Sequence, residues 1–439
     1  MGKKSLRLRS MVALLALGVF NVTIAHADDL FRYYQHLHAN PELSHFEKNT
    51  SANLAAELRK AGYKVTERVG KYEDGSQAYG VVAVLENGPG PRLLIRADMD
   101  ALPIVEETGL PYASKIKAKN AMGQEIGVMH ACGHDLHVTA LVGTARELAA
   151  RRQEWRGTLV LVGQPSEETL DGAQAMLRDG LYERFGRPDM ALAMHDSAAI
   201  PTGEVGVYAG ATHAAVTSID VIIRGVGGHG AAPHRGRDPI VMAAQFINQI
   251  QTIVSRNQDP LDSAVVTVGS IHGGTKRNII PDEVKLELTT RAHSDKAMKI
   301  IIDGIRRAAD GLAVSNGLAE DRKPIVKIIE TETGPANVNN RDLVARVKKS
   351  IAKVLGSAKV SDGFPIMGSE DFALYSLPQR EIPTVLFNVG VTEAEHLAKA
   401  NAGLAYVPGT HTSKFAPIAE PAIKASVQAM SAAAIDLLQ

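Results

Sequence analysis

The chain has 439 residues, of which 45% are apolar, and this is enough for a large core divided between roughly two or three domains. Its 48 basic and 48 acidic residues balance, so the charge gives no indication of a nucleic acid or an anionic membrane as a partner. The single cysteine excludes an internal disulfide.

The N-terminus has the pattern of a cleavable export signal. Basic residues precede an apolar run from Met11 to Phe20, and a small-x-small sequence, Ala-His-Ala, ends just before Asp28. A membrane anchor is the alternative, but the run is short for a membrane span. We therefore expect residues 1–27 to be a signal peptide, and the mature protein to be periplasmic or secreted, without a membrane anchor.

The stretch that follows alternates between helical and strand-like patterns, which predicts an α/β domain. Residues 28–70 have a helical pattern. Apolar runs at 81–85 and 92–96 flank a turn and predict a hairpin or a pair of adjacent strands. Apolar spacing over 138–150 predicts a helix. The continuous apolar run at 157–163 predicts a buried strand in a sheet that is covered on both faces.

The pattern changes near residue 212. Strand patterns and two amphipathic stretches then follow in the order β-α-β-β-α, which suits helices packed on one face of a small sheet. After residue 326 the alternation of predicted helices and strands returns, so an α+β insertion into one catalytic domain is the simplest interpretation. We expect a signal peptide at 1–27, a catalytic domain formed by 28–211 together with 327–439, and an inserted domain at 212–326.

Residues of the types that bind metals recur near the ends of predicted strands. These residues are Asp98 and Asp100, Cys132 and His134, Glu167 and Glu168, His195, and His411. Each has a commonplace alternative, because carboxylates also cap helices or face solvent, and a lone histidine or cysteine is often structural. Sites in open α/β sheets form at the carboxyl ends of strands, and thiolate with imidazole suits zinc-like ions. Their recurrence therefore predicts a metal site.

The adjacent glutamates Glu167 and Glu168 suit a division of labour. We expect neighbouring side chains to diverge, so that one carboxylate binds metal while the other faces a bound water. The free carboxylate would take a proton from the water and return it to the leaving amine, while metals polarise the carbonyl group.

Seven motifs then identify a family. They are HLHANPELS (36–44), RADMDALP (96–103), MHACGHDLHVT (129–139), GQPSEE (163–168), GGHGAAPH (227–234), NIIPD (278–282) and MGSEDFA (367–373). Together they resemble the amidohydrolase branch of the aminoacylase and carboxypeptidase zinc-peptidase superfamily, which includes hippurate hydrolases and indole-acetyl-amino-acid hydrolases. The resemblance covers essentially the whole mature chain. It implies a two-metal peptidase-like catalytic domain with an inserted lid and dimerisation domain, a homodimer, and hydrolysis of the amide bond of N-acyl amino acids.

The resemblance also implies a role for individual residues. Cys132 would bridge two divalent ions in each subunit, Glu167 would be the general base, and Asp98 would orient ligands rather than bind metal. The further metal ligands would be His134, Glu168, His195 and His411. Zinc is the expected metal, with manganese and cobalt as alternatives.

The inserted domain supplies a second set of candidates. His229 lies between glycines, where a turn with a surface histidine is the commonplace alternative. The resemblance implies that it reaches a partner's active site and stabilises the oxyanion. Asn278 and Arg291 are candidates for holding the substrate carboxylate, which suits the bidentate fork of arginine. An ordinary surface charge is the alternative for Arg291.

Two other functions stay open at this point. A dipeptidase or metallo-carboxypeptidase could use the same metals, although free-amine substrates need an acidic partner that the sequence does not identify. A non-catalytic, metal-dependent binding protein is the more remote alternative, and Glu167 argues against it because binding needs no general base. Ser166, Asp196 with Ser197, and Thr410 depart from the family's usual pattern near the acyl pocket, so the acyl group stays open.

Overall fold

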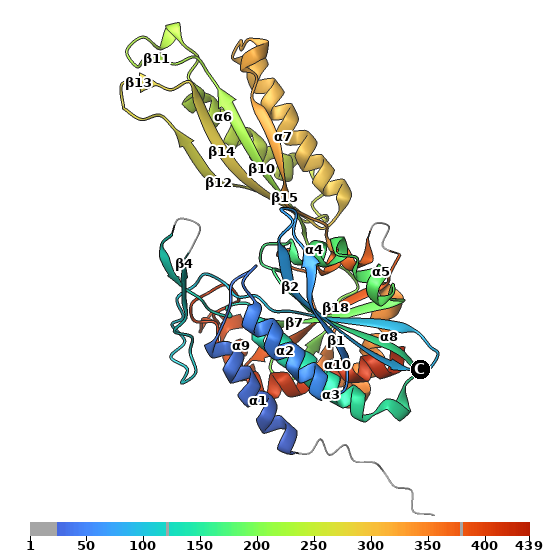
Figure 1. Ribbon diagram of the computed structural model, residues 1–439. Coiled ribbons are helices and arrows are strands. Elements are labelled where there is room, and N and C mark those ends of the chain that lie inside the picture. Colours follow the sequence, from blue (N-terminus) through green and yellow to red (C-terminus); the bar gives the residue numbers. More distant parts are fainter. Residues whose placement is uncertain (1–23, 120–122, 378–380) are drawn as a thin grey trace, which may run out of the picture.

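The computed structural model describes residues 24–119, 123–377 and 381–439. The apolar run of the expected signal peptide lies outside these residues. The described chain forms a larger domain, in which helices enclose a sheet, and a smaller domain that projects from it (Figure 1). Within the described ranges, no helix combines the length and the apolar character needed to span a membrane.

The larger domain is built on an eight-stranded sheet. Its strands, in spatial order, are β1 (Lys64–Lys71), β2 (Gln77–Asn87), β6 (Gly157–Gln164), β3 (Arg92–Asp98), β7 (Met190–Pro201), β18 (Thr384–Thr392), β8 (Val205–Gly206) and β17 (Val360–Ser361). The inner strands β6, β3, β7 and β18 are parallel, so their carboxyl ends share one edge of the sheet.

Helices cover both faces of this sheet, as the apolar run at 157–163 predicted. Leu159 and Leu161 of β6 face one core, and the alternate residues Val160 and Val162 face the other. The first layer consists of α1 (Ile24–Ala39), α2 (Lys48–Lys60), α3 (His134–Ala150), α8 (Arg341–Leu355) and α10 (Ala419–Leu437), and the second of α4 (Gly172–Arg178) and α5 (Leu181–Phe185). Shorter peripheral elements are β4 (Lys117–Lys119), β5 (Glu125–Gly127) and α9 (Ala394–Asn401).

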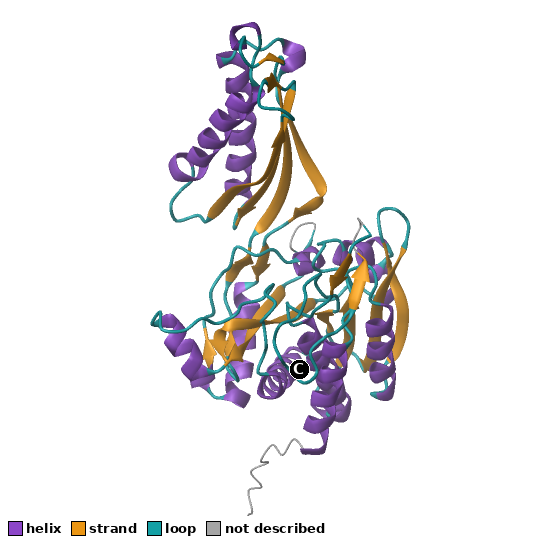
Figure 2. Ribbon diagram, turned by 90° about the vertical axis from the view of Figure 1, so that its left-hand side faces the viewer, coloured by secondary structure: helices purple, strands orange, loops and turns teal. Residues whose placement is uncertain are grey.

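The smaller domain is an antiparallel sheet with helices on one face, shown edge-on in Figure 2. Its strands, in spatial order, are β12 (Ala264–Gly273), β14 (Glu283–Ala292), β10 (Ala215–Arg224) and β15 (Ile325–Gly334), and its helices are α6 (Pro239–Thr252) and α7 (Asp295–Ser315). Alternate residues of β10 pack on these helices. The predicted fold class, an α/β catalytic domain with an inserted α+β sandwich, is confirmed.

The two domains are connected by paired strands, β9 (Gly210–His213) and β16 (Asn337–Asn339). Because β15 belongs to the inserted sheet, that sheet extends past residue 326, where we expected the insertion to end. The β15 strand was harder to recognise because its residues are mostly exposed or half-buried.

Two further expectations about the sheet were wrong. The strands at 81–85 and 92–96 are not adjacent, because β6 lies between β2 and β3. The intervening helix α3 provides the crossover that a parallel β3–β6 pair requires. The stretch at 28–70 is not helical throughout, since its end forms β1, where Val65, Thr66 and Val69 supply β-branched side chains.

Candidate metal centre

The carboxyl edge of the inner strands brings together residues that the sequence singled out. Glu167 and Glu168 follow the end of β6, and His195 lies in β7. Cys132 and His134 come from the turn that begins α3. Parallel strands and a helix start therefore deliver sulfur, imidazole and carboxylate groups to one place.

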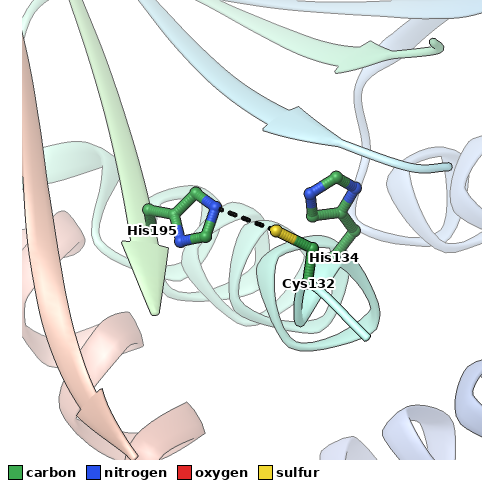
Figure 3. Close-up of side chains that lie close together, drawn as sticks. All are labelled: Cys132, His134 and His195. Atoms are coloured by element: carbon green, nitrogen blue, oxygen red, sulfur yellow. Dashed lines mark hydrogen bonds between the residues drawn. The ribbon is translucent and has the colours of Figure 1, made fainter. Parts of the chain in front are cut away.

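The turn before α3 aims two of these groups in the same direction. Gly133 has a φ of 74°, in the left-handed region that favours glycine. A Cβ at this position would also collide with the carboxylate of Asp196. Only glycine therefore fits between Cys132 and His134, and the turn places the two side chains beside each other, with the sulfur of Cys132 directed toward His195 (Figure 3).

The distances among these side chains are those of a metal-binding cluster. The Sγ atom of Cys132 lies 3.6 Å from Nε2 of His195 and 3.3 Å from Nε2 of His411. The Oε1 atom of Glu168 lies 3.4 Å from Nε2 of His411 and 3.9 Å from Nε2 of His134. Cys132 belongs to one group of potential ligands with His134 and His195, and to another with Glu168 and His411. A thiolate that bridges two ions would occupy this position.

The chemistry of the cluster fits divalent cations. Nε2 of His134 and Oε1 of Glu168 are buried without a hydrogen-bond partner. Burial alone would lower the pKa of His134, but the carboxylates of Asp98 and Asp100 raise it well above its usual range. Burial and the charge of Glu168 raise the pKa of the Cys132 thiol. Two divalent ions would satisfy the unpaired atoms, balance the carboxylates and stabilise a thiolate.

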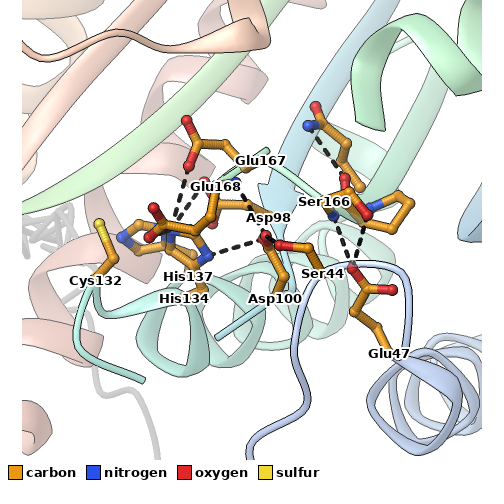
Figure 4. Close-up of polar contacts among 12 residues, drawn as sticks. Ser44, Glu47, Asp98, Asp100, Cys132, His134, His137, Ser166, Glu167 and Glu168 are labelled. Carbon is orange, nitrogen blue, oxygen red and sulfur yellow. Dashed lines mark hydrogen bonds and ion pairs between the residues drawn. The ribbon is translucent and has the colours of Figure 1, made fainter. Parts of the chain in front are cut away.

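Asp100 orients two of the candidate ligands at once. Its Oδ1 atom lies 3.2 Å from Nδ1 of His134. Its Oδ2 atom accepts hydrogen bonds from the backbone N–H of Glu168 at 3.0 Å and from Oγ of Ser44 at 2.7 Å (Figure 4). The contact between Asp100 and Nδ1 of His134 leaves Nε2 of His134 facing the cluster.

Asp98 is occupied by other partners, as an orienting role requires. Its Oδ1 atom lies 2.5 Å from Nδ1 of His137, and its Oδ2 atom accepts from Nη1 of Arg96 at 2.6 Å. His137 in turn accepts from the backbone N–H of Asp196 at 3.0 Å. Nδ1 of His195 donates to the backbone carbonyl of Asp196 at 2.8 Å, so its Nε2 is free to bind metal.

Sequence reasoning missed the acidic partners of Arg96. This buried guanidinium donates to Oε1 of Glu370 at 2.8 Å and to Oδ1 of Asp371 at 3.0 Å. Gln164 donates to Asp371 at 2.7 Å. The motif MGSEDFA marked the segment, but no spacing rule connects position 370 with position 96.

Glu167 is a buried carboxyl with a perturbed proton affinity. It and Glu168 do not diverge as expected, because Oε2 of Glu167 and Oε1 of Glu168 each lie 3.9 Å from Nε2 of His134. They differ in that Glu168 also belongs to the group with Cys132 and His411. Burial and the neighbouring carboxylates of Glu370 and Glu168 raise the pKa of Glu167 well above its ordinary value. A raised pKa makes this carboxylate a stronger base than an exposed glutamate.

The inserted-domain candidates lie elsewhere in the chain. His229 is exposed in β11 (Gly228–His229), which pairs with β13 (Ile279–Ile280), and the N–H of Gly230 donates to the carbonyl of Asn278 at 2.9 Å. These strands lie at the end of the inserted domain that points away from the larger domain (Figures 1 and 2). Arg291 lies near the end of β14, in the four-stranded sheet of the inserted domain, where it donates to Oγ of Ser369 of the larger domain. One chain alone therefore does not bring His229 and Asn278 to the cluster.

Comparison with known proteins places this arrangement in a family. Residues 94–405 match the model of peptidase family M20/M25/M40. A hippurate hydrolase of Campylobacter jejuni is 37% identical over 77% of this chain and 82% of its own length. The IAA-amino acid hydrolase ILR1-like 2 of Arabidopsis thaliana is 35% identical over 80% of this chain and 74% of its own. The crystal structure of a dinuclear metal-binding peptidase of the M20 family from Bacillus subtilis superposes with a TM-score of 0.75 at 29% identity, covering 94% of this chain and 99% of that one.

Proposed function

The chain belongs to peptidase family M20/M25/M40, and we propose that it hydrolyses the amide bond of N-acyl amino acids, releasing a carboxylic acid and a free amino acid. The predicted family is confirmed, as is a metal-dependent amidohydrolase with two divalent ions. The observation that carries the proposal is the buried Glu167 beside a cluster of sulfur, imidazole and carboxylate donors. The names of the two enzyme relatives describe hydrolases of this substrate class.

The chain's own residues divide the work as follows. The side chains that would hold the ions are Cys132, His134, Glu168, His195 and His411. Bound divalent ions supply Lewis acidity, which polarises a carbonyl group and makes water a stronger acid. Glu167 accepts the proton of the attacking water, and then delivers it to the nitrogen as the C–N bond breaks. Burial and the neighbouring carboxylates raise its pKa, which favours uptake of the proton from water.

We propose zinc as the native metal. A thiolate and imidazoles are ligands that zinc prefers, and binding would protect the lone thiol from oxidation in an exported protein. Manganese and cobalt are the alternatives. Export itself is proposed from the N-terminal sequence.

We propose further that the enzyme is a homodimer in which His229 completes the site of the partner. Nδ1 of His229 accepts from the backbone N–H of Ala231 at 3.0 Å, so in the neutral ring Nε2 carries the proton. That N–H is free to donate to the oxyanion of a tetrahedral intermediate. Asn278 would enter the same site beside it, while Arg291 would hold the substrate carboxylate at the base of the inserted sheet.

The test is a substrate screen with metal-free protein reconstituted separately with zinc, manganese or cobalt. Panels of N-acyl amino acids and of free dipeptides are compared by release of the free amino acid. We expect metal-dependent release from the N-acyl amino acids, and release that is slower by roughly 10²–10⁴-fold from the Glu167→Gln variant. Preference for dipeptides would identify a dipeptidase or carboxypeptidase instead. Metal binding without hydrolysis of any substrate would indicate a binding protein.

A further inference from the structure

A buried histidine outside the metal centre lies between two carboxylates. His38, near the end of α1, is 1% exposed. Its Nδ1 lies 2.7 Å from Oδ2 of Asp135, and its Nε2 lies 3.1 Å from Oε1 of Glu106. Tyr34 and Tyr112 pack around the ring. Both nitrogens therefore face acceptors, which only a doubly protonated ring satisfies.

The surroundings hold His38 in its charged form. Burial alone would lower its pKa, but the hydrogen bonds and charges of Asp135 and Glu106 raise it from 6.5 to about 10. The imidazolium therefore persists throughout the neutral range. Without it, Asp135 and Glu106 would flank a neutral ring with no cation between them, which is costly in a protein interior.

The two carboxylates connect His38 to two segments that carry candidate metal ligands, Asp135 directly and Glu106 through the residue that follows it. Asp135 follows His134 in the first turn of α3, in the same stretch as Cys132. Glu106 anchors the loop whose next residue, Glu107, contacts the chain just beyond His411.

The contacts of this loop are specific. The backbone N–H of Glu107 donates to the carbonyl of Ser413 at 2.7 Å, and Oγ of Ser413 donates to Oε2 of Glu107 at 2.7 Å. The carboxylate of Glu106 also accepts from the N–H of Ser114 at 2.6 Å, which fixes the loop from within. A rigid connection thus leads from His38 through Glu106 to the residues after His411.

The His411 segment needs such a connection. The side chain of His411 is 55% exposed, so little packing holds it in place. Its φ of 63° is a strained conformation for a residue with a side chain. One backbone hydrogen bond, from the N–H of His411 to the carbonyl of Ala131 at 2.7 Å, joins it directly to the Cys132 turn.

We propose that His38 is a positioning residue of the metal centre, which holds the His411 segment against the Cys132–His134 turn by binding Glu106 and Asp135 at once. This inference rests on the ligand set proposed above. Loss of the link should weaken the ion that depends on His411 more than the ion that depends on His134. Outer contacts of this kind typically change metal affinity by about 10–100-fold.

The experiment measures cobalt binding by the purified, metal-free protein. Co²⁺ is titrated into wild type, His38→Gln and Glu106→Gln, and binding is followed by the thiolate-to-cobalt absorption band and by equilibrium dialysis. Glu106→Gln keeps the size of the side chain and an acceptor, so it provides a folded test even where His38→Gln does not fold. The matched control is His36→Gln, an exposed histidine on the same helix.

We expect wild type and the His36 variant to bind two equivalents tightly. His38→Gln and Glu106→Gln should bind the first equivalent normally and the second about 10-fold or more weakly. Excess cobalt should then restore turnover, because no group that touches the substrate has changed. Unchanged binding of both equivalents would overturn the inference, and so would equal weakening of both, which indicates general support of the fold. A wild type that fails to bind two equivalents would instead overturn the ligand set itself.

Discussion

The carboxyl edge of the large sheet and the tip of the inserted domain carry catalytic candidates in opposite settings. At the sheet edge the polar groups are mostly buried. Their positions are fixed by further polar contacts, such as those of Asp100 with His134 and of Arg96 with Asp98. At the tip, His229 and Asn278 are exposed and are held by a pair of short strands. The first region has the preorganisation that metal binding requires, whereas the second presents hydrogen-bond donors to solvent.

This difference suits two separate roles, metal binding at the sheet edge and stabilisation of the oxyanion by the tip. Ligands must hold ions at fixed distances, so they occupy strand ends and a helix start within one domain. An oxyanion donor is needed only when substrate is present, so it can arrive from another chain. We therefore infer that the metal centre is complete in one chain, whereas the catalytic site is shared between two.

Replacing Cys132, the proposed bridging ligand, should have the largest effect. Cys132→Ala removes a sulfur that belongs to a group of potential ligands with His134 and His195 and to another with Glu168 and His411, so both ions should bind weakly and turnover should fall to background. Metal content after dialysis is the measurement, with unfolding temperature as the control for folding. Full occupancy by two ions together with normal turnover would remove Cys132 from the ligand set.

Replacing Glu167 should impair turnover, whereas replacing Glu168 should impair metal binding. Glu167→Gln should keep both ions and lose roughly 10²–10⁴-fold in turnover, as expected for a missing general base. Glu168→Gln should lose metal first, because its carboxylate also faces His411. Metal analysis and kinetics on the same preparations separate the two. A metal-poor Glu167 variant beside a metal-replete Glu168 variant would exchange their roles.

The buried ion pairs of the larger domain should contribute far more to the free energy of unfolding than an exposed ion pair of the inserted domain. Arg96→Met leaves the buried carboxylates of Asp98 and Glu370 without their cation, and should lower the free energy of unfolding by about 3–5 kcal/mol. Its matched control is Lys299→Met, in the exposed pair with Asp303 on α7, which should leave the free energy of unfolding nearly unchanged. Urea unfolding of both variants tests this, and similar losses would contradict the contrast between the regions.

Removing the exposed donor should affect turnover alone. His229→Ala should keep both ions and lose about 10²–10³-fold in kcat, the usual effect of deleting one oxyanion donor. The control is His272→Ala, another exposed histidine of the inserted domain, which should behave as wild type. A loss confined to KM would indicate substrate binding rather than stabilisation of the oxyanion.

The sequence predicted the fold class and the convergence of the metal-type residues because both depend on local patterns. Gly133 fixes a turn, and parallel strands bring their carboxyl ends together. Strand order was less accessible, since the pairing of β6 between β2 and β3 depends on a long crossover. The contacts of Glu370 with Arg96, and of His38 with Asp135 and Glu106, could not be predicted either. They join residues far apart in the sequence that meet only through tertiary packing.

The most direct test of a shared site is a mixed dimer. Chains carrying His229→Ala are co-expressed with chains carrying Glu167→Ala, each strongly reduced in turnover alone, and two different tags isolate the hybrid. In that hybrid, one site draws Glu167 from the first chain and His229 from the second. With random pairing, about a quarter of all sites in the mixture should therefore be active under two-fold symmetry. A purified hybrid without activity above either parent would contradict the shared site, because a histidine that serves its own chain leaves no site complete.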